Sequence, residues 1–430
     1  MSVARASGTG RMDVAIIADD LTGAADSGVQ LMRSGYRTAV VFRGAQIPPG
    51  NDLDAVAVDT NSRPLPAGFA AKRVVESGHA LRESRIVYKK IDSTLRGPIG
   101  AELAAALAAT GRKKALVAPA FPSTDRKTRG GTQLVHGEPV HETGLSEDPV
   151  APILESHVPS LLAHAFHSIV ALSVAEVRNG EPIRAALESD DCIVADAESD
   201  ADLEALVRAV PDPSSVLWAG SAGLARALGE VYPGPHHGVP PGTFAPAWGV
   251  LAVVGSVSEV AREQLRRLSE EPGVATVYLD TVALLYGSYK ETVGEATEAV
   301  RAGLSSDRGA VLCSSAGEEV DRALRGESVS RNEVSKRVSA ALAEVVAGLS
   351  GEDLFDALVL TGGDTAVRVA RALGATGIQL EGEVEAGVPV GTLVGLRPYR
   401  VVTKAGGFGD PDTLRNAFRT LVKPQENGEA

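Results

Sequence analysis

Residues 88–97 read YKKIDSTLRG and bring four charged side chains and two hydroxyl groups to the expected end of a strand. From residue 85 to residue 129 the chain has ten Lys or Arg and three Asp or Glu, whereas the whole chain has a net charge of -13. Fixed cations in a cleft of low dielectric attract a carboxylate or phosphate more strongly than scattered surface charges do. This concentration of positive charge therefore indicates a binding site for a small anion.

This segment contains more polar residues than a simple structural role requires. Strand alternation places Lys90 and Asp92 on one side. A simpler interpretation is one Lys–Asp ion pair followed by a helix cap at Ser93 or Thr94. Together with Arg96, however, the donors outnumber what one ion pair and one cap require. We therefore interpret the segment as a polar ligand site.

Polar residues also follow two other expected strands. Asp19 and Asp20 come directly after the first strand and precede a helix, which Asp20 or Thr22 could simply cap. Two adjacent carboxylates exceed what a cap needs, so one could face the ligand as a hydrogen-bond acceptor, a general base or a metal ligand. Residues 59–63, DTNSR, are typical of a turn when taken alone. Their guanidinium, Arg63, can nevertheless hold a carboxylate with two parallel hydrogen bonds.

A long polar segment, residues 119–137, reads PAFPSTDRKTRGGTQLVHG and contains four charged residues between Asp125 and Arg129. Long loops without secondary structure in compact domains are usually functional or disordered. We expect this loop to cover the substrate as a lid.

Three turns rich in small residues follow expected strands in the second half of the chain. They are GSVS at 255–258, TGGDT at 361–365 and AGGFG at 405–409. Glycine lets a ligand approach backbone N–H groups at the positive end of a helix, which is how many proteins bind phosphate. Neither GxGxxG nor a Walker A motif is present, which disfavours a Rossmann dehydrogenase or a P-loop enzyme. The three turns together predict a groove for a nucleotide.

These segments all belong to repeated units of an apolar strand, a polar turn and an Ala-rich helix. Such units build parallel sheets covered by helices, and the low aromatic content of 4% agrees with cores of Ala, Val, Leu and Ile. A chain of 430 residues exceeds one usual core. We predict an α/β protein with two domains, 12–231 and 249–422, each a mostly parallel sheet flanked by helices. Residues 232–248, rich in Pro and Gly, form the predicted linker, and the active site is expected in the cleft between the domains.

Charge and cysteine content exclude several classes of partner. The acidic balance outside the basic segment argues against nucleic acid and against an anionic membrane surface. Cys192 and Cys313 each lie in an apolar run and are predicted to be buried free thiols, as in a reducing compartment. No apolar run reaches the length of a signal-peptide core at the N-terminus or of a membrane span elsewhere. We expect a cytoplasmic protein that acts on small molecules.

Eight motifs in the chain follow the order found in a known family. They are IADDLTGAAD, DTNSR, KKIDSTLRGPIGAEL, PAFP, GSAGLA, GSVS, TGGDT and KAGGFG, and they extend over roughly residues 12–421. A set of ordered motifs is far more specific than any one of them. On these residues the chain resembles the four-carbon acid sugar kinases, formerly an uncharacterised family.

The resemblance implies ATP-dependent phosphorylation of the terminal hydroxyl of a tetronic acid such as D-threonate, D-erythronate or 3-oxo-tetronate. It also implies an N-terminal substrate domain and a C-terminal nucleotide domain. The substrate would contact Asp20, Arg63 and the stretch Lys90, Ile91, Asp92 and Ser93. ATP would contact Ser258, Gly362, Gly363, Asp364, Thr365 and Gly406 or Gly407.

The residue chemistry agrees with this assignment. Lys90, Arg63 and Arg96 can hold the substrate carboxylate, while Asp92 and Ser93 can hydrogen-bond its hydroxyl groups. Phosphoryl transfer also needs a carboxylate near the attacking hydroxyl. Asp20 is the first candidate for this base and Asp92 the second. Asp364 could coordinate magnesium through water or could itself be the base; Mg²⁺ is inferred from the use of ATP, and no metal-ligand motif is present.

Other interpretations remain open at this point. A non-catalytic sensor would bind the acid sugar and the nucleotide without turnover. An oxidoreductase or aldolase could act on the same acids, although the missing GxGxxG weighs against a nicotinamide enzyme. The sequence does not distinguish threonate, erythronate and the oxo-acid, and a homodimer is only the commonest assembly.

Overall fold

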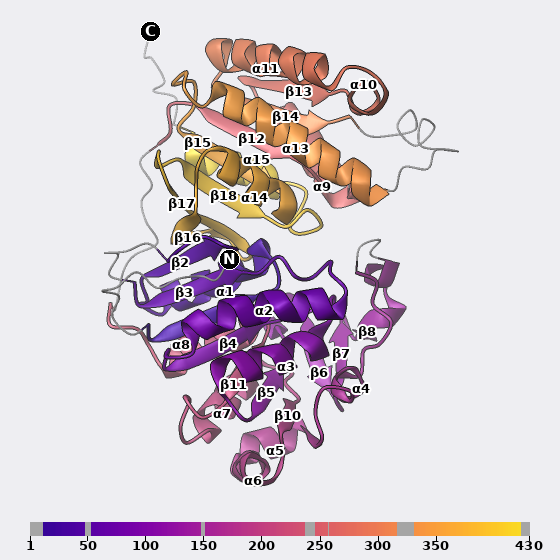
Figure 1. Ribbon diagram of the computed structural model, residues 1–430, viewed down its shortest axis with the longest axis vertical. Helices are drawn as coiled ribbons and strands as arrows, with labels where there is room; N and C mark the ends of the chain where they lie inside the picture. The colour runs from indigo at the N-terminus through magenta and orange to yellow at the C-terminus, as the bar shows by residue number, and fades with distance from the viewer. Residues whose placement is uncertain are drawn as a thin grey trace. The chain divides into compact units, whose positions relative to one another are not determined.

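The computed structural model describes residues 12–47, 53–147, 151–236, 246–256, 258–315 and 331–422. The chain divides into two compact units, Met1–Val239 (unit 1) and Pro240–Ala430 (unit 2), which are described separately. Both units contain a mostly parallel sheet flanked by helices, which confirms the predicted fold class (Figure 1). Of the predicted linker, residues 237–245 lie outside the described part of the chain.

The sheet of unit 1 consists of parallel strands. They are β1 (Val14–Ala18), β2 (Thr38–Phe42), β3 (Ala55–Asp59), β4 (Ile86–Lys90), β5 (Ala115–Ala118), β9 (Ile169–Leu172), β10 (Cys192–Ala195) and β11 (Leu217–Gly220). Their order is β2-β3-β1-β4-β11-β5-β10-β9. In the register, Ala18 lies opposite both Asp59 and Lys90, and Lys90 lies opposite Gly220. The last residues of the central strands therefore lie side by side at one edge of the sheet.

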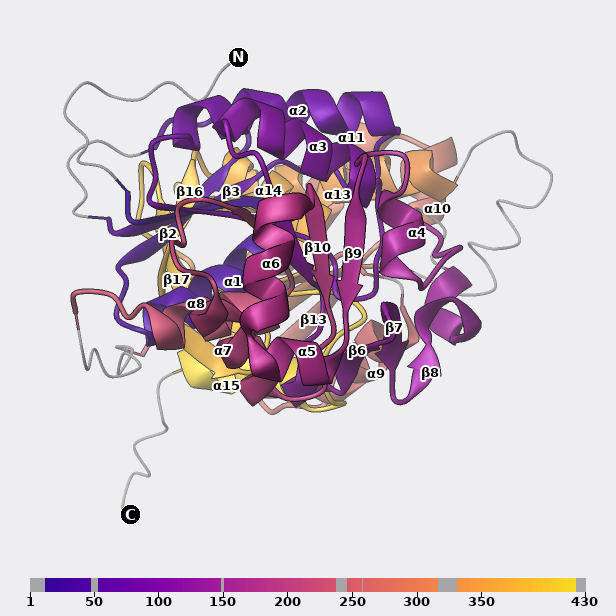
Figure 2. The same ribbon diagram turned by 90° about the horizontal axis from the view of Figure 1, so that it is seen from below.

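Helices cover both faces of this sheet. They are α1 (Leu21–Arg33), α2 (Ala67–Leu81), α3 (Ile99–Thr110), α4 (Val158–Leu162), α5 (Val174–Asn179), α6 (Glu181–Ser189), α7 (Asp200–Ala209) and α8 (Ala222–Val231). Helices α2 and α3 pack together on one face, and α1, α7 and α8 pack together on the other (Figure 2). Apart from the edge strand β9, the strands between them are buried on both faces and consist largely of Val, Ile, Leu and Ala, as is typical of parallel strands.

The segment 119–137 is not the long loop that was expected. It forms a small antiparallel sheet from β6 (Arg126–Arg129), β7 (Thr132–Val135) and β8 (Glu138–Pro139). Glycines at 130 and 131 have φ of +57° and +73° and make the tight turn between the first two strands. The sequence did not indicate this hairpin, because charged residues in succession are more typical of a loop than of a strand.

Unit 2 has a mixed sheet. Its strands are β12 (Val250–Val254), β13 (Val274–Leu279), β14 (Gly309–Ser314), β15 (Ala357–Thr361), β16 (Gly377–Glu385), β17 (Val388–Val394) and β18 (Arg400–Lys404). Within the unit they are ordered β13-β14-β12-β15-β18-β17-β16, and β17 runs antiparallel to both of its neighbours. Val254 lies opposite Thr361, which lies opposite Lys404, so the central parallel strands again end together.

Helices also cover both faces of the unit 2 sheet. They are α9 (Glu259–Ser269), α10 (Thr281–Tyr286), α11 (Tyr289–Ser306), α13 (Arg331–Leu349), α14 (Gly363–Ala372) and α15 (Thr413–Leu421). Helices α9 and α15 pack together, while α11, α13 and α14 form the opposite layer (Figure 1). Each of the three small-residue turns predicted from the sequence follows one of the central strands of this sheet.

The two cysteines are buried free thiols, as predicted. Cys192 lies in β10 and Cys313 in β14. Burial raises the pKa of each thiol to about 12. None of the helices in the described ranges combines the length and the apolar character that crossing a membrane would require.

Candidate functional site

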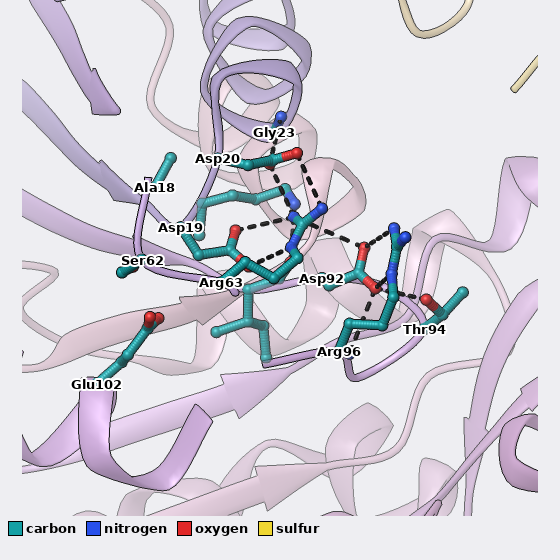
Figure 3. Close-up of polar contacts among 12 residues, drawn as sticks. Ala18, Asp19, Asp20, Gly23, Ser62, Arg63, Asp92, Thr94, Arg96 and Glu102 are labelled. Atoms are coloured by element: carbon teal, nitrogen blue, oxygen red, sulfur yellow. Dashed lines mark hydrogen bonds and ion pairs between the residues drawn. The ribbon is translucent and has the colours of Figure 1, made fainter. Parts of the chain in front are cut away.

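Arg63 connects the two aspartates that follow β1 (Figure 3). Its Nε and Nη2 donate to the two carboxylate oxygens of Asp19 at 2.7 and 3.0 Å. Its Nη1 and Nη2 donate to the two oxygens of Asp20 at 2.8 and 2.7 Å. Burial alone would raise the pKa of Asp19, but Arg63, Lys89 and Lys90 together outweigh it and hold that pKa below its usual value. The guanidinium of Arg63 thus binds two carboxylates of the protein itself.

Asp92 forms the second half of this network. Its carboxylate accepts hydrogen bonds from Arg96 Nε at 2.6 Å and Arg96 Nη2 at 3.1 Å, and also from the hydroxyl of Thr94 (Figure 3). Arg63 Nη2 lies 3.8 Å from the Asp92 Oδ1. Burial opposes the charged form, but Arg96 and Arg63 keep the pKa of Asp92 well below its ordinary value. Asp92 therefore remains ionised and is a poor proton acceptor.

Local backbone contacts bring these side chains together. The N–H groups of Ser62 and Arg63 both donate to the main-chain oxygen of Asp19, at 2.8 and 3.2 Å. This joins the turn after β3 to the turn after β1. Asp20 is also the N-cap of α1, because its Oδ1 accepts from the N–H of Gly23 at 2.9 Å. Asp20 therefore has both roles that its sequence position left open, a cap and a member of the polar cluster.

The two lysines at the end of β4 have different surroundings. Lys89 is fully buried and forms an ion pair of 2.8 Å with Glu102 of α3. Lys90 donates to the main-chain oxygen of Ile91 at 2.8 Å. A Cβ atom at Gly23 would lie only 2.9 Å from Lys90 Nζ, so the start of α1 has no room for a side chain there. The simpler alternative of a Lys90–Asp92 ion pair is not formed within 4.0 Å in the part of the chain that the structure describes.

Ile91 and Ser93, which were also predicted to contact the substrate, make hydrogen bonds through their backbone. Ile91 donates its N–H to Gly220 and belongs to the apolar core. The main-chain oxygen of Ser93 accepts from Gln133 Nε2 at 2.8 Å, which joins the β6–β7 hairpin to this loop. No described residue hydrogen-bonds the Ser93 hydroxyl, which leaves it able to bind a ligand.

In unit 2, the three small-residue turns lie against one another. The N–H of Gly362 donates to the main-chain oxygen of Lys404 at 3.0 Å, and the hydroxyl of Ser258 donates to the main-chain oxygen of Gly406 at 2.9 Å. A Cβ atom at Gly406 would overlap Ser256. Glycine at this position is thus required by the close packing of two turns. The sequence-predicted turns are brought together at the carboxyl ends of β12, β15 and β18.

Lys404 is the residue in this region that sequence reasoning did not single out. It is 1% exposed and donates to the main-chain oxygen of Ala405 at 2.8 Å. None of the described carboxylates lies within ion-pair distance of its ammonium. Burial lowers the pKa of Lys404 to about 8, and Glu385 only partly offsets this effect. A lysine in an apolar strand next to a Gly-Gly turn was the available signal.

Asp364 lies in the first turn of α14 and is half exposed. Its Oδ2 accepts hydrogen bonds from Arg368 Nε at 2.8 Å and from the Ser339 hydroxyl at 3.1 Å. Across the described ranges, no group of three or more His, Cys, Asp or Glu side chains is arranged to hold a metal ion. Asp364 is therefore a single carboxylate beside the small-residue turns.

Comparison with protein families divides the chain in the same way as its sheets. Residues 14–228 match a family described as a sugar-binding N-terminal domain. Residues 251–414 match one described as a nucleotide-binding C-terminal domain.

Full-length relatives have related names. A D-threonate kinase of Salmonella typhimurium is 35% identical, with 95% of this chain and 98% of the relative covered. The D-threonate kinase of Bordetella bronchiseptica is 37% identical over 95% of this chain and 97% of its own. A D-erythronate kinase of Heliobacterium modesticaldum is 32% identical over 96% and 98%. A solved structure from Salmonella typhimurium LT2 is similar in fold, with a TM-score of 0.78 at 24% identity, covering 95% of this chain and 99% of that one.

Proposed function

The chain belongs to the four-carbon acid sugar kinase family, and we propose that it transfers the terminal phosphoryl group of ATP to the terminal hydroxyl of a four-carbon sugar acid. The observation that carries the proposal is the contrast between its two sheet edges. One presents carboxylates and cations suited to a polyol acid, and the other presents small-residue turns suited to phosphate. In this proposal, residues 12–231 bind the acid sugar and residues 249–422 bind ATP, with 232–248 as the linker.

We assign to Asp20 the role of the base that accepts the proton from the attacking hydroxyl of the sugar acid. Its side chain is 23% exposed, compared with 4% for Asp19 and 9% for Asp92. Of the three carboxylates it is therefore the most accessible to a ligand. Asp92, held in its ionised form by two arginines, is better suited to accept hydrogen bonds from substrate hydroxyls than to take a proton. Arg63 orients Asp20 through its two-pronged contact, which favours a fixed geometry at the attacking hydroxyl.

We assign the phosphates of ATP to the turns of unit 2, with Ser258, Gly362 to Thr365, Gly406 and Gly407 as the contacts. The backbone N–H groups at the start of α14 and the ammonium of Lys404 both favour an anion there. Magnesium, when bound with ATP, neutralises charge on the phosphates. It commonly keeps several waters and needs only one or two protein carboxylates. The Oδ1 of Asp364, which no described residue hydrogen-bonds, fits this limited requirement.

D-threonate is the substrate that we place first, because two similar relatives are named for it. D-erythronate is the next candidate, since a relative of that name covers the chain equally well, and 3-oxo-tetronate follows for the same reason. The alternative of a non-catalytic sensor is disfavoured because full-length relatives of the chain are named kinases.

An ADP-release assay tests the proposal. The purified protein is incubated with ATP, Mg²⁺ and each of the three acids, and the product is identified by ³¹P NMR as a 4-phosphate. We expect rapid ADP release with at least one acid and slow release without any acceptor. Absence of acid-dependent ADP release with all three would refute the kinase assignment, and calorimetry would then show whether the protein is a sensor that binds without turnover.

We further propose that the enzyme works in the cytoplasm, where ATP is supplied and buried free thiols stay reduced. A homodimer is the simplest symmetric assembly for it. Light scattering on the purified protein measures the assembly directly.

A further inference from the structure

The arginines first assigned to the substrate carboxylate already have partners. Arg63 makes four hydrogen bonds with Asp19 and Asp20, and Arg96 makes two side-chain bonds with Asp92. A substrate carboxylate would have to compete with these internal partners. Removing one partner of such a buried pair is costly, so a substrate gains little by displacing it. Another cation is needed to hold the acid group.

Arg126 of β6 is such a cation. Its Nη1 donates to the Thr124 hydroxyl at 3.3 Å, and its Nε is buried without a hydrogen-bond partner. No carboxylate of the described ranges lies within 4.0 Å of its guanidinium. The other cations of the same strand differ, because Lys127 pairs with Asp125 at 3.2 Å and Arg129 pairs with Glu198 at 2.7 Å. A buried N–H group without a partner is rare in native proteins and needs an explanation.

Strand alternation shows which way Arg126 faces. Arg126 and Thr128 are two residues apart on β6 and lie on the same face. The Thr128 hydroxyl donates to Gln133 Oε1 at 2.7 Å, and Gln133 Nε2 in turn donates to the main-chain oxygen of Ser93 at 2.8 Å. This face of the hairpin is therefore turned toward the loop that carries Asp92 and Ser93.

The electrostatics of Arg126 agree with this placement. Burial lowers the pKa of Arg126, and the charges of Asp92 and Asp26 partly offset the effect. An arginine in a protein stays protonated at neutral pH. A positive charge thus persists near the polar cluster.

The hairpin holds Arg126 in a fixed position. Thr128 exchanges two backbone hydrogen bonds with Ala197, of 3.0 and 3.1 Å, and the N–H of Gly131 donates to Asp196 Oδ1 at 2.9 Å. These contacts join the C-terminal end of β6 and the turn that follows it to the body of unit 1. A side chain on a backbone held in this way has less conformational entropy to lose when it binds a ligand.

We propose that Arg126, together with Lys90, binds the carboxylate of the acid sugar and so selects the acid over the corresponding neutral polyol. This inference rests on the proposed function and names the residues that recognise the carboxylate of the substrate. Arg63 and Arg96 then act as positioning residues, which hold Asp19, Asp20 and Asp92 in place. Lys90 fits the shared role because its ammonium, bonded to the Ile91 carbonyl, has no described carboxylate within 4.0 Å.

The test compares Arg126→Gln with Arg129→Gln, a matched change on the same strand. Binding of D-threonate is measured by calorimetry without ATP, and KM values are measured for D-threonate, for the neutral alcohol D-threitol and for ATP. We expect Arg126→Gln to weaken D-threonate binding by about 10²-fold and to leave the KM values for D-threitol and ATP within about twofold. Arg129→Gln, whose side chain is exposed and paired with Glu198, should change none of them.

A purely structural role for Arg126 would not discriminate between the acid and the alcohol. Equal losses for D-threonate and D-threitol, or no loss for either, would therefore overturn the inference while leaving the kinase assignment intact. Binding of D-threonate that Arg126→Gln weakens, with no turnover of D-threonate, D-erythronate or 3-oxo-tetronate, would support the inference and refute the kinase assignment. No binding of D-threonate, D-erythronate or 3-oxo-tetronate to the wild type would overturn both. If Arg126→Gln does not fold, Arg126→Lys keeps the charge but loses the fork and should weaken D-threonate binding by about tenfold.

Discussion

Lys90 and Lys404 occupy equivalent places in the two units. Each is the last residue of a central strand, and each donates its ammonium to the main-chain oxygen of the next residue at 2.8 Å. Around Lys90 the neighbouring strand ends carry Asp19, Asp20 and Asp92, whereas around Lys404 the turns are mostly Gly, Ser and Thr. The carboxyl ends of the central strands thus present charged side chains in unit 1 and mainly backbone groups in unit 2.

This difference teaches how one architecture serves two kinds of ligand. Recognition of a polyol needs several hydrogen-bonding side chains at fixed positions, and these must hold one another in place. Recognition of phosphate needs N–H groups, a helix N-terminus and a cation, with little else in the way. Unit 1 therefore has an internally paired network, and unit 2 keeps a lysine without a charged partner among its described residues.

The largest effect is expected at the base. Asp20→Asn keeps an oxygen that can cap α1 but cannot accept the hydroxyl proton, so kcat should fall by about 10²–10⁴-fold. The melting temperature should fall as well, because the amide loses the ion pair and one of the two hydrogen bonds with Arg63. The ADP-release assay and a thermal melt measure the two quantities. Activity within about threefold of wild type would move the base to another residue, and Asp92→Asn would then be compared.

A second change gives unit 1 a buried lysine without a charged partner, as Lys404 is among the described residues of unit 2. Glu102→Gln leaves Lys89 buried without its charged partner, and it should lower the free energy of unfolding by about 3–5 kcal/mol. Urea denaturation measures this loss. Glu259→Gln, on an exposed helix position with a weak contact of 4.0 Å to Arg262, is the control and should stay within about 0.5 kcal/mol. A small loss for Glu102→Gln would mean that the ion pair is not the reason for the burial of Lys89.

The opposite result is expected at Lys404. Because the pKa of Lys404 is lowered to about 8, the unfolded chain binds more protons than the folded one between pH 8 and the ordinary value of 10.5, so stability rises with pH across this range. Lys404→Met should therefore stabilise the free protein at pH 7 by about 1–3 kcal/mol, and this gain should disappear toward pH 10.5.

The same substitution should weaken ATP binding, because the ammonium is lost. In the wild type, kcat/KM for ATP should fall as pH rises through about 8, and this step should be absent in Lys404→Met. Denaturation at pH 7 and pH 10 together with a pH–rate profile measures both effects. A variant that is less stable at pH 7 and keeps its affinity for ATP would contradict this assignment of Lys404.

The smallest effect distinguishes two adjacent glycines. A Cβ atom at Gly406 would overlap Ser256, so Gly406→Ala should lower the stability of the ligand-free protein by about 1–3 kcal/mol. A Cβ atom at Gly407 would meet no atom within 4 Å, so Gly407→Ala should change it by no more than about 0.5 kcal/mol. Thermal melts without nucleotide compare the two. Equal melting temperatures would show that the turns that carry Gly406 and Ser256 can move apart without a loss of stability.

Much of the fold could be predicted because its strands are short apolar runs bounded by polar turns. Thr38–Phe42, Ala115–Ala118, Val274–Leu279 and Arg400–Lys404 are strands that coincide with such runs in the sequence. The hairpin of β16 and β17 was missed, because β16 alternates buried residues with glutamates that lowered its apolar signal. The β6–β7 hairpin was missed for the same reason, since its residues are mainly polar.

The candidate site was found only in part. Asp20, Arg63, Asp92 and Arg96 could be named because each follows an apolar strand, and such positions are visible in the sequence. That Arg63 binds Asp19 and Asp20, 44 and 43 residues away, depends on β1 lying beside β3, which the sequence does not show. The Lys89–Glu102 pair likewise depends on how α3 packs against β4.

The two buried cysteines make the protein convenient for site-specific labelling. With pKa values near 12, both thiols are almost entirely protonated at neutral pH and react slowly with maleimides and oxidants. The chain has only these two cysteines. A cysteine introduced at an exposed position such as Tyr278 would therefore be the single reactive thiol, and a fluorophore attached there would report on unit 2 alone.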